Sequence, residues 1–286
     1  MTSPATSPSG DQAAAREREV PEPVEPLRVG LSRGPVEVLD LPADPEKVDT
    51  APLVFLHEGL GSLRLWRSFP ADVHAATGRR TVVWSRHGHG DSAVVTAPRD
   101  VTYMHEEAVL VLPELLARLD LVAPVLVGHS DGASIALINA ASSRAGLDVE
   151  PPTAVVAMAP HVVVEDVSID GITAAREAWE TSDLPARMAR HHRDASATFW
   201  GWNRIWLDPA FRDWDITPYL PGIGCPVLGV QGRDDQYGTM HQLDLLQAGV
   251  AGPFTRVELD DCRHAPHLDR PDATRAAVVD FLAGLP

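Results

Sequence analysis

The chain has 286 residues, enough for one large α/β domain, or such a domain with an insertion, and for a substantial buried core. Its 40 acidic and 24 basic residues give a formal net charge of −16 at pH 7, which repels nucleic acids and anionic membrane surfaces, so we expect neither as a partner. It has two cysteines, no apolar stretch near the length of a membrane span and no basic-then-apolar signal at its start, so we expect a reduced, cytoplasmic setting.

The chain order of apolar runs predicts an α/β fold. Residues 1–26 are Pro, Ser, Ala and charge without apolar periodicity, so we expect a disordered tail. Residues 27–41 alternate about a Gly-Pro turn, which indicates an antiparallel hairpin at a sheet edge. Beyond it, short apolar runs alternate with helical stretches, which predicts a mostly parallel sheet of about eight strands with helices on both faces. The further strands are predicted at 53–56, 81–84, 125–127, 154–157, 227–230 and 255–259.

This alternation stops between the sixth and seventh predicted strands. We therefore predict a helical cap over residues 161–220, inserted into an α/β core of residues 27–160 and 221–286. Aromatic residues recur at helical spacing in the cap, so one side of a cap helix is aromatic. These rings either pack the cap or line an apolar pocket, and we place Trp202 and Trp206 in a substrate pocket.

The sequence Gly128-His129-Ser130-Asp131-Gly132 follows the predicted strand at 125–127 and precedes a helical stretch. A strand that turns at once into a helix strains its corner residue, and glycines two before and two after the corner keep strand and helix apart. Ser130 is then lifted clear of the sheet as a candidate nucleophile. The N–H of Asp131 lies at the helix N-terminus, where it suits a developing oxyanion.

A serine nucleophile needs a base, and a carboxylate must hold that base in one tautomer. Asp234 and Asp235 follow the strand at 227–230, at the sheet edge where Ser130 stands. We predict that Asp235, three residues after a glycine, orients the base, and Asp234 is the alternative.

Two histidines follow the last predicted strand. His264 arrives in a loop at the same sheet edge, and we predict it as the base. His267 follows a proline and begins to turn towards the final helix, so we interpret it as a structural or pocket residue. The chain order Ser, Asp, His matches a known order of the catalytic triad.

Over residues 27–284 the chain resembles the α/β-hydrolase fold family in its capped form. Besides the serine, aspartate and histidine segments, two motifs carry the resemblance. They are Leu56-His57-Glu58-Gly59-Leu60-Gly61-Ser62 with Trp66, and Ser85-Arg86-His87-Gly88-His89-Gly90-Asp91-Ser92. By position, the resemblance implies that the N–H of Gly59 is the second oxyanion donor, with Leu60 the donor in an alternative register. The second motif resembles a loop of the family that supports the base.

Glu58 stands where the family commonly has glycine. We expect backbone N–H groups to hold its carboxylate, and a contact with substrate or a water is the functional alternative, in which Glu58 belongs to the substrate pocket. The two histidines of the second motif lack a third ligand at a sensible spacing, so we expect no metal and no cofactor.

The resemblance implies acyl transfer to water, with Ser130 attacking a carbonyl, His264 shuttling the proton and Asp235 holding His264. We therefore predict a serine hydrolase that cleaves a carboxylic ester of an apolar or bulky small molecule. Ser130 argues against a dehalogenase or an epoxide hydrolase of this fold, which would carry Asp at that position. Carbon–carbon bond hydrolases, lactonases and cofactor-free lyases use the same three residues and stay open, as does a hydrolase-like receptor without turnover.

Overall fold

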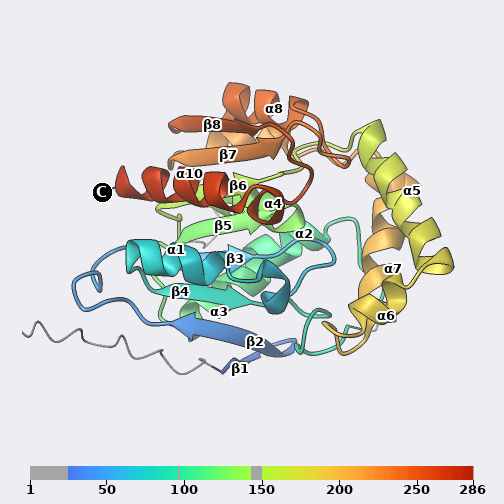
Figure 1. The fold of residues 1–286 in the computed structure, drawn as a ribbon, viewed down its shortest axis with the longest axis horizontal. Helices are drawn as coiled ribbons and strands as arrows, with labels where there is room; N and C mark the ends of the chain where they lie inside the picture. Colours follow the sequence, from blue (N-terminus) through green and yellow to red (C-terminus); the bar gives the residue numbers. More distant parts are fainter. Residues whose placement is uncertain (1–24, 96, 143–149, 286) are drawn as a thin grey trace, which may run out of the picture.

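The computed structural model describes residues 25–95, 97–142 and 150–285, so all but the last two residues of the predicted tail lie outside the described residues. One eight-stranded sheet, in the order β1-β2-β4-β3-β5-β6-β7-β8, forms the centre of the molecule (Figure 1). β1 (Leu27–Leu31) and β2 (Gly34–Leu41) form the predicted antiparallel hairpin at one edge, and the other strands run parallel to one another. The parallel strands are β3 (Leu53–Leu56), β4 (Thr81–Trp84), β5 (Val125–His129), β6 (Ala154–Met158), β7 (Val227–Gly232) and β8 (Phe254–Leu259). The predicted fold class is thereby confirmed.

Strand burial explains why these segments read as continuous apolar runs. Every residue of β3, β4, β5, β6 and β7 is buried, because helices cover both faces of a parallel sheet. At the far edge, β8 is mostly half-exposed. The alternating sequence of an edge strand and the unbroken apolar sequence of a central strand therefore follow from the same layering.

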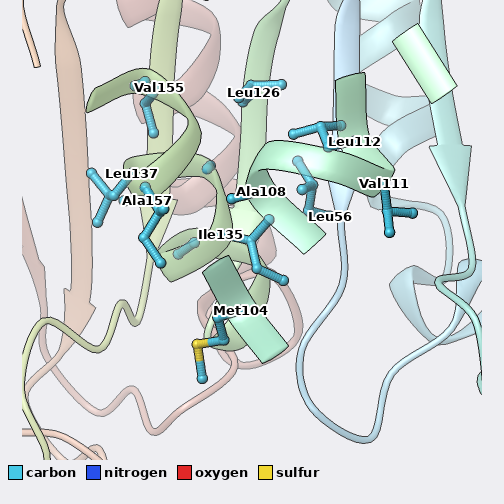
Figure 2. Close-up of a cluster of buried hydrophobic side chains, with 14 of the residues drawn as sticks. Leu56, Met104, Ala108, Val111, Leu112, Leu126, Ile135, Leu137, Val155 and Ala157 are labelled. Atoms are coloured by element: carbon cyan, nitrogen blue, oxygen red, sulfur yellow. The ribbon is translucent and has the colours of Figure 1, made fainter. Parts of the chain in front are cut away.

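Two helical layers enclose the sheet. α1 (Phe69–Thr77) and α10 (Pro271–Ala283) pack side by side on one face, with α9 (Pro266–Asp269) before them, and contribute to one hydrophobic cluster. α3 (Leu112–Arg118), α4 (Asp131–Ser142) and α8 (His241–Gly249) contribute to the cluster on the other face. Figure 2 shows this second cluster, in which Ile135 and Leu137 of α4 lie beside the sheet residues Leu56 and Ala157.

The helical stretch that the sequence predicts between β4 and β5 is interrupted. α2 (Tyr103–Glu106) passes into a π-helical turn at Glu107–Val111 before α3 begins. Pro113, in the first turn of α3, has no N–H to donate and its ring crowds the carbonyl one turn back, so the preceding turn widens. The departure therefore has a local cause in one proline.

The segment between β6 and β7 contains α5 (Asp166–Thr181), α6 (Leu184–Met188) and α7 (Ala195–Trp206), followed by two short 3-10 turns. In Figure 1 these helices, in yellow, stand beyond the carboxyl ends of the parallel strands. The aromatic side of α7 is buried, and Phe199 stacks on Trp179 of α5 with ring centroids 4.3 Å apart. Aromatic packing thus joins the two long helices of this segment.

Two further expectations from the sequence were reduced cysteines and no membrane span. Cys225 precedes β7 and Cys262 follows β8, at opposite ends of two neighbouring parallel strands, and both thiols are free. Among the described residues, no helix combines the length and the apolar character that crossing a bilayer requires.

Candidate active site

Ser130 occupies a sharp turn between β5 and α4. Its φ of 53° lies in the left-handed region, which a residue with a side chain adopts only under constraint. Gly128 and Gly132 supply the constraint, because an added Cβ at Gly128 would strike the start of α4 and one at Gly132 would strike the carbonyl of Leu56. The Ser130 N–H donates to the carbonyl of Met158 on β6 at 2.9 Å, which anchors the turn to the sheet.

Three side chains from three strand ends form one hydrogen-bonded chain. The Oγ of Ser130 lies 2.9 Å from Nε2 of His264, and Nδ1 of His264 lies 2.8 Å from Oδ2 of Asp235. A carboxylate only accepts, so Nδ1 carries the proton and the free Nε2 of a neutral ring accepts from the serine hydroxyl. The structure thus brings together the three residues that the sequence singled out.

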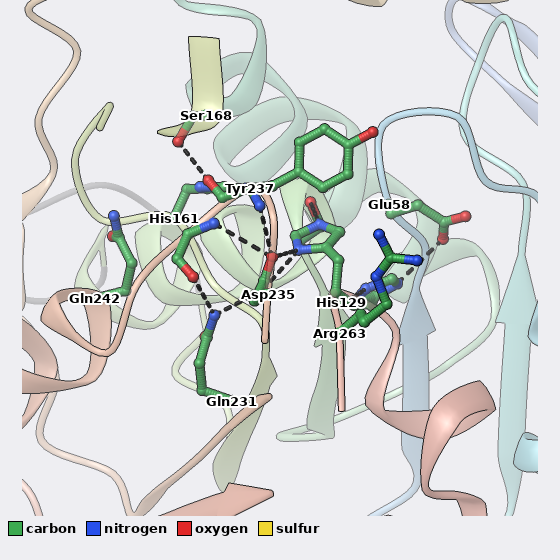
Figure 3. A network of polar contacts seen from close by, with 12 residues as sticks. Glu58, His129, His161, Ser168, Gln231, Asp235, Tyr237, Gln242 and Arg263 are labelled. Atoms are coloured by element: carbon green, nitrogen blue, oxygen red, sulfur yellow. Dashed lines mark hydrogen bonds and ion pairs between the residues drawn. The ribbon is translucent and has the colours of Figure 1, made fainter. Parts of the chain in front are cut away.

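The carboxylate of Asp235 is buried and fully engaged (Figure 3). Gln231 donates to Oδ2 at 2.7 Å, and the backbone N–H groups of Tyr237 and Gly238 donate to Oδ1 at 2.8 and 3.3 Å. Burial raises the pKa of Asp235, but the charge of His264 and these hydrogen bonds outweigh it, so the pKa lies below its ordinary value. Asp235 is therefore a carboxylate at neutral pH.

Asp234, the alternative acid, and His267, the other histidine, lie outside this hydrogen-bonded chain. Asp234 is exposed, and its backbone N–H donates to the carbonyl of Cys262. His267 is buried against Trp66, with ring centroids 4.7 Å apart, and burial lowers its pKa to about 3. Neither side chain hydrogen-bonds to His264 in the part of the chain that the structure describes.

Gly59, Leu60 and Asp131 line the same cavity as Ser130, and their N–H groups hydrogen-bond to no described residue. Unpaired N–H groups at a helix N-terminus and in an adjacent loop can bind a developing oxyanion. The carboxylate of Asp131 lies beside Gly59 and accepts from the Tyr103 hydroxyl at 2.7 Å. That hydroxyl in turn accepts from Trp206 Nε1 at 3.1 Å, so α7 is tied to the residue that follows the nucleophile.

The expectation for Glu58 was wrong in one respect. Within the described ranges no backbone N–H holds its carboxylate; instead Oε2 faces Nδ1 of His129 at 3.4 Å. The other ring nitrogen of His129 donates to the carbonyl of His264 at 2.6 Å, so both nitrogens face acceptors. Burial lowers the pKa of His129, but Glu58 and this carbonyl outweigh it and raise the pKa. Glu58, whose side chain is 28% exposed, therefore pairs with the ring of His129, beside His264.

No residue of the loop 85–92 hydrogen-bonds to His264, which the resemblance implied that this loop supports. Arg86 is buried, and its guanidinium donates to the carbonyls of His57 and Glu58 at 3.3 and 3.0 Å. His89 Nε2 donates to the carbonyl of Gly59 at 3.0 Å. The hydrogen bonds of this loop thus position residues 57–59. Across the described residues, no group of three or more His, Cys, Asp or Glu side chains is arranged to hold a metal ion.

A cavity of about 90 Å³ lies over Ser130. Ile172 of α5 and Trp202 and Trp206 of α7 form one side of it. Glu58, Ser130 and His264 also line the cavity, so both predicted tryptophans and Glu58 belong to its wall.

Three residues that sequence reasoning missed also border the site. His161 and Tyr237 line the cavity, and Tyr103 lies behind Asp131. Burial and the neighbouring His264 lower the pKa of His161 to about 3, so its ring is neutral. Tyr237 follows Asp235 by two residues and could have been found by that proximity, whereas no pattern in the sequence marks Tyr103.

Comparisons with known proteins identify the family of the chain. A family model described as "Alpha/beta hydrolase family" matches residues 53–277. The sn-1-specific diacylglycerol lipase ABHD11 of Danio rerio is 29% identical over 145 residues, which are 50% of this chain and 43% of that protein. Epoxide hydrolase A of Mycobacterium tuberculosis is 32% identical over 82 residues, which are 28% of this chain and 26% of that protein. The chain therefore spans less than half the length of these curated relatives.

Solved structures show the same fold. The crystal structure of a membrane phospholipase A, a bacterial virulence factor, superimposes with a TM-score of 0.72 at 18% identity and covers 91% of this chain and 86% of that one. This likeness extends beyond the match of the family model to nearly the whole chain. Because that match itself takes in more than half of the sequence, the protein belongs to the α/β hydrolase family.

Proposed function

We propose that this protein is a serine hydrolase that cleaves a carboxylic ester of an apolar or bulky small molecule through an acyl-enzyme. One observation carries the proposal: the chain from Ser130 Oγ through His264 to Asp235, with links of 2.9 and 2.8 Å, opens onto an apolar cavity. The names of the related diacylglycerol lipase and phospholipase A support an ester as the substrate. Ser130 stands against epoxide opening by an aspartate nucleophile.

The reaction begins when the Oγ of Ser130 attacks the ester carbonyl and its proton passes to Nε2 of His264. The oxyanion of the tetrahedral intermediate accepts from the N–H groups of Asp131 and Gly59. Asp235 holds the Nδ1–H and stabilises the imidazolium. When the C–O bond breaks, the leaving alcohol takes the proton from His264, and a water activated by the same ring then releases the acid.

The helical segment of residues 161–220 acts, in this proposal, as a cap over the core. Its support is the position of Ile172, Trp202 and Trp206 on the cavity wall. The Trp202 ring lies so close to Gly59 that a Cβ at that position would overlap it. The cap therefore sets which acyl or alcohol group fits beside the oxyanion loop, and the core performs the chemistry.

The test is labelling with a fluorophosphonate, followed by turnover of a panel of p-nitrophenyl esters with graded acyl size. The adduct is expected on Ser130, and Ser130→Ala should lower kcat by about three orders of magnitude or more with an unchanged melting temperature. Ser68→Ala, at an exposed serine, is the control and should behave as wild type. An adduct on another serine contradicts the proposal, and ligand-induced stabilisation without turnover indicates a receptor.

A further inference from the structure

A second cavity adjoins the one over Ser130. It has a volume of about 520 Å³ and lies between the loop that carries the oxyanion donor and the region of α6. Glu58 and Leu60 belong to the walls of both cavities, on either side of Gly59. We call the second cavity the basic pocket, because Arg67, Arg187 and Arg190 line it.

The charge of the basic pocket is opposite to that of the protein as a whole. The chain has 40 acidic and 24 basic residues, yet the pocket carries three arginines and a single acid, Glu58. Glu58 itself faces the ring of His129, which raises the pKa of that ring. The wall is therefore a local excess of positive charge on an acidic protein.

The arginines are available to a ligand. Arg187 lies 3.5 Å from Asp183, an exposed pair that is worth little in water, and neither Arg67 nor Arg190 pairs with a carboxylate among the described residues. His191, in the same wall, has a pKa lowered by burial and then by Arg67 and Arg190. The effect of the two arginines on the pKa of His191 agrees with a positive potential on that side of the pocket.

The rest of the wall is apolar. Leu65, Leu184 and Met188 line the pocket together with Leu60. A guanidinium presents a planar fork of N–H groups that matches a carboxylate or a phosphate. The pocket thus suits a molecule with an apolar chain and an anionic end.

We propose that the basic pocket binds an anionic group of the ester substrate, a carboxylate or a phosphate, while the ester carbonyl lies at Ser130. This inference rests on the proposed function, because it treats Ser130 as the reacting centre. Glu58 and Leu60 line both cavities, so a substrate chain that passes along these two residues places the ester in one cavity and the anion in the other. The enzyme then selects esters that carry a negative charge.

The experiment compares neutral esters with matched esters that carry an added anionic group. One pair is p-nitrophenyl hexanoate and mono-p-nitrophenyl adipate; the other is 2-hydroxyethyl hexanoate and 2-(hexanoyloxy)ethyl phosphate. Wild type is expected to prefer at least one anionic member, and the pair that shows the preference distinguishes carboxylate from phosphate. Arg67→Gln with Arg190→Gln should reduce that preference in kcat/KM by about threefold to tenfold, mainly through KM, and high salt should reduce it in wild type.

Arg204→Gln is the control, since its guanidinium lies over the Trp200 ring beside a different cavity and should leave the preference unchanged. Equal turnover of charged and neutral esters by wild type, or an equal loss on both in the double variant, overturns the proposal.

A binding measurement separates this proposal from the hydrolase itself. Adipate or inorganic phosphate should raise the melting temperature of Ser130→Ala, and the rise should disappear when the two arginines are replaced. If fluorophosphonate fails to label Ser130 but this shift is seen, the hydrolase proposal fails and the anion site stands. If labelling succeeds and neither anion shifts the melting temperature, the anion site fails alone.

Discussion

Replacing Asp235 by asparagine should change the tautomer of His264. Oδ1 of Asp235 accepts from the backbone N–H groups of Tyr237 and Gly238, which are fixed by the chain, so the amide oxygen takes that place. The amide nitrogen then occupies the position of Oδ2, which lies 2.8 Å from Nδ1 of His264. Oδ1 also lies 2.9 Å from Nδ1, but it already accepts from the two backbone N–H groups. The NH₂ group only donates, so it favours the tautomer in which Nδ1 accepts and Nε2 carries the ring proton. His264 then has no lone pair for the hydroxyl of Ser130.

The expected loss in kcat/KM is about 10³- to 10⁴-fold, which is about 4 to 5.5 kcal/mol in the activation free energy. The amide nitrogen also faces the donor Nε2 of Gln231, which lies 2.7 Å from Oδ2, so a loss of about 1–3 kcal/mol in the free energy of unfolding accompanies the change. Steady-state hydrolysis of a fluorogenic ester measures the first effect, and thermal unfolding of the same sample measures the second. Asp234→Asn, at an exposed neighbour, is the matched control and should remain close to wild type.

Equal small losses in the two variants would refute this reasoning, because the carboxylate would then have no part in holding the base. A large loss at Asp234→Asn alone would transfer the role to Asp234. If a variant unfolds at the assay temperature, its kinetics are measured at a lower temperature at which it is folded. The ratio of the two kcat/KM values, measured on folded protein, decides the assignment.

Three further outcomes are expected. Burial lowers the pKa values of His161, His192 and His267 to about 3, about 4 and about 3. These three rings therefore take up protons below about pH 6.5 in the unfolded chain but not in the native protein. The free energy of unfolding should therefore fall by about 1.4 kcal/mol per pH unit for each ring between pH 6 and 5; denaturant titrations measure it, and a constant value contradicts it. Gly132→Ala should lower the melting temperature sharply, because its Cβ would overlap the carbonyl of Leu56; an unchanged melting curve would contradict the steric argument. Trp202→Ala should change the relative kcat/KM among esters by about tenfold while phosphonate labelling persists; a proportional loss on all esters with a lower melting temperature would mean that the ring only packs the cap.

Local sequence patterns were enough to predict the strands and much of the candidate site. The apolar runs that became β3, β5 and β7 were visible because a strand covered on both faces admits few polar residues. The turn at Ser130 was visible because only glycines fit two residues to either side of it. Asp235 and His264 were candidates because the carboxyl ends of parallel strands share one edge, where side chains distant in sequence meet.

Tertiary structure alone decided what surrounds these residues. The carboxylate of Glu58 faces the buried ring of His129 and not a backbone N–H of its own loop. No spacing in the sequence relates positions 58 and 129. The link from Asp131 through Tyr103 to Trp206, and the gathering of Arg67 with the arginines near α6, likewise join segments far apart in the chain. Strand and turn signals depend on neighbours within a few residues, whereas charge pairing and cavity walls depend on how separate loops pack, and only the folded chain brings those loops together.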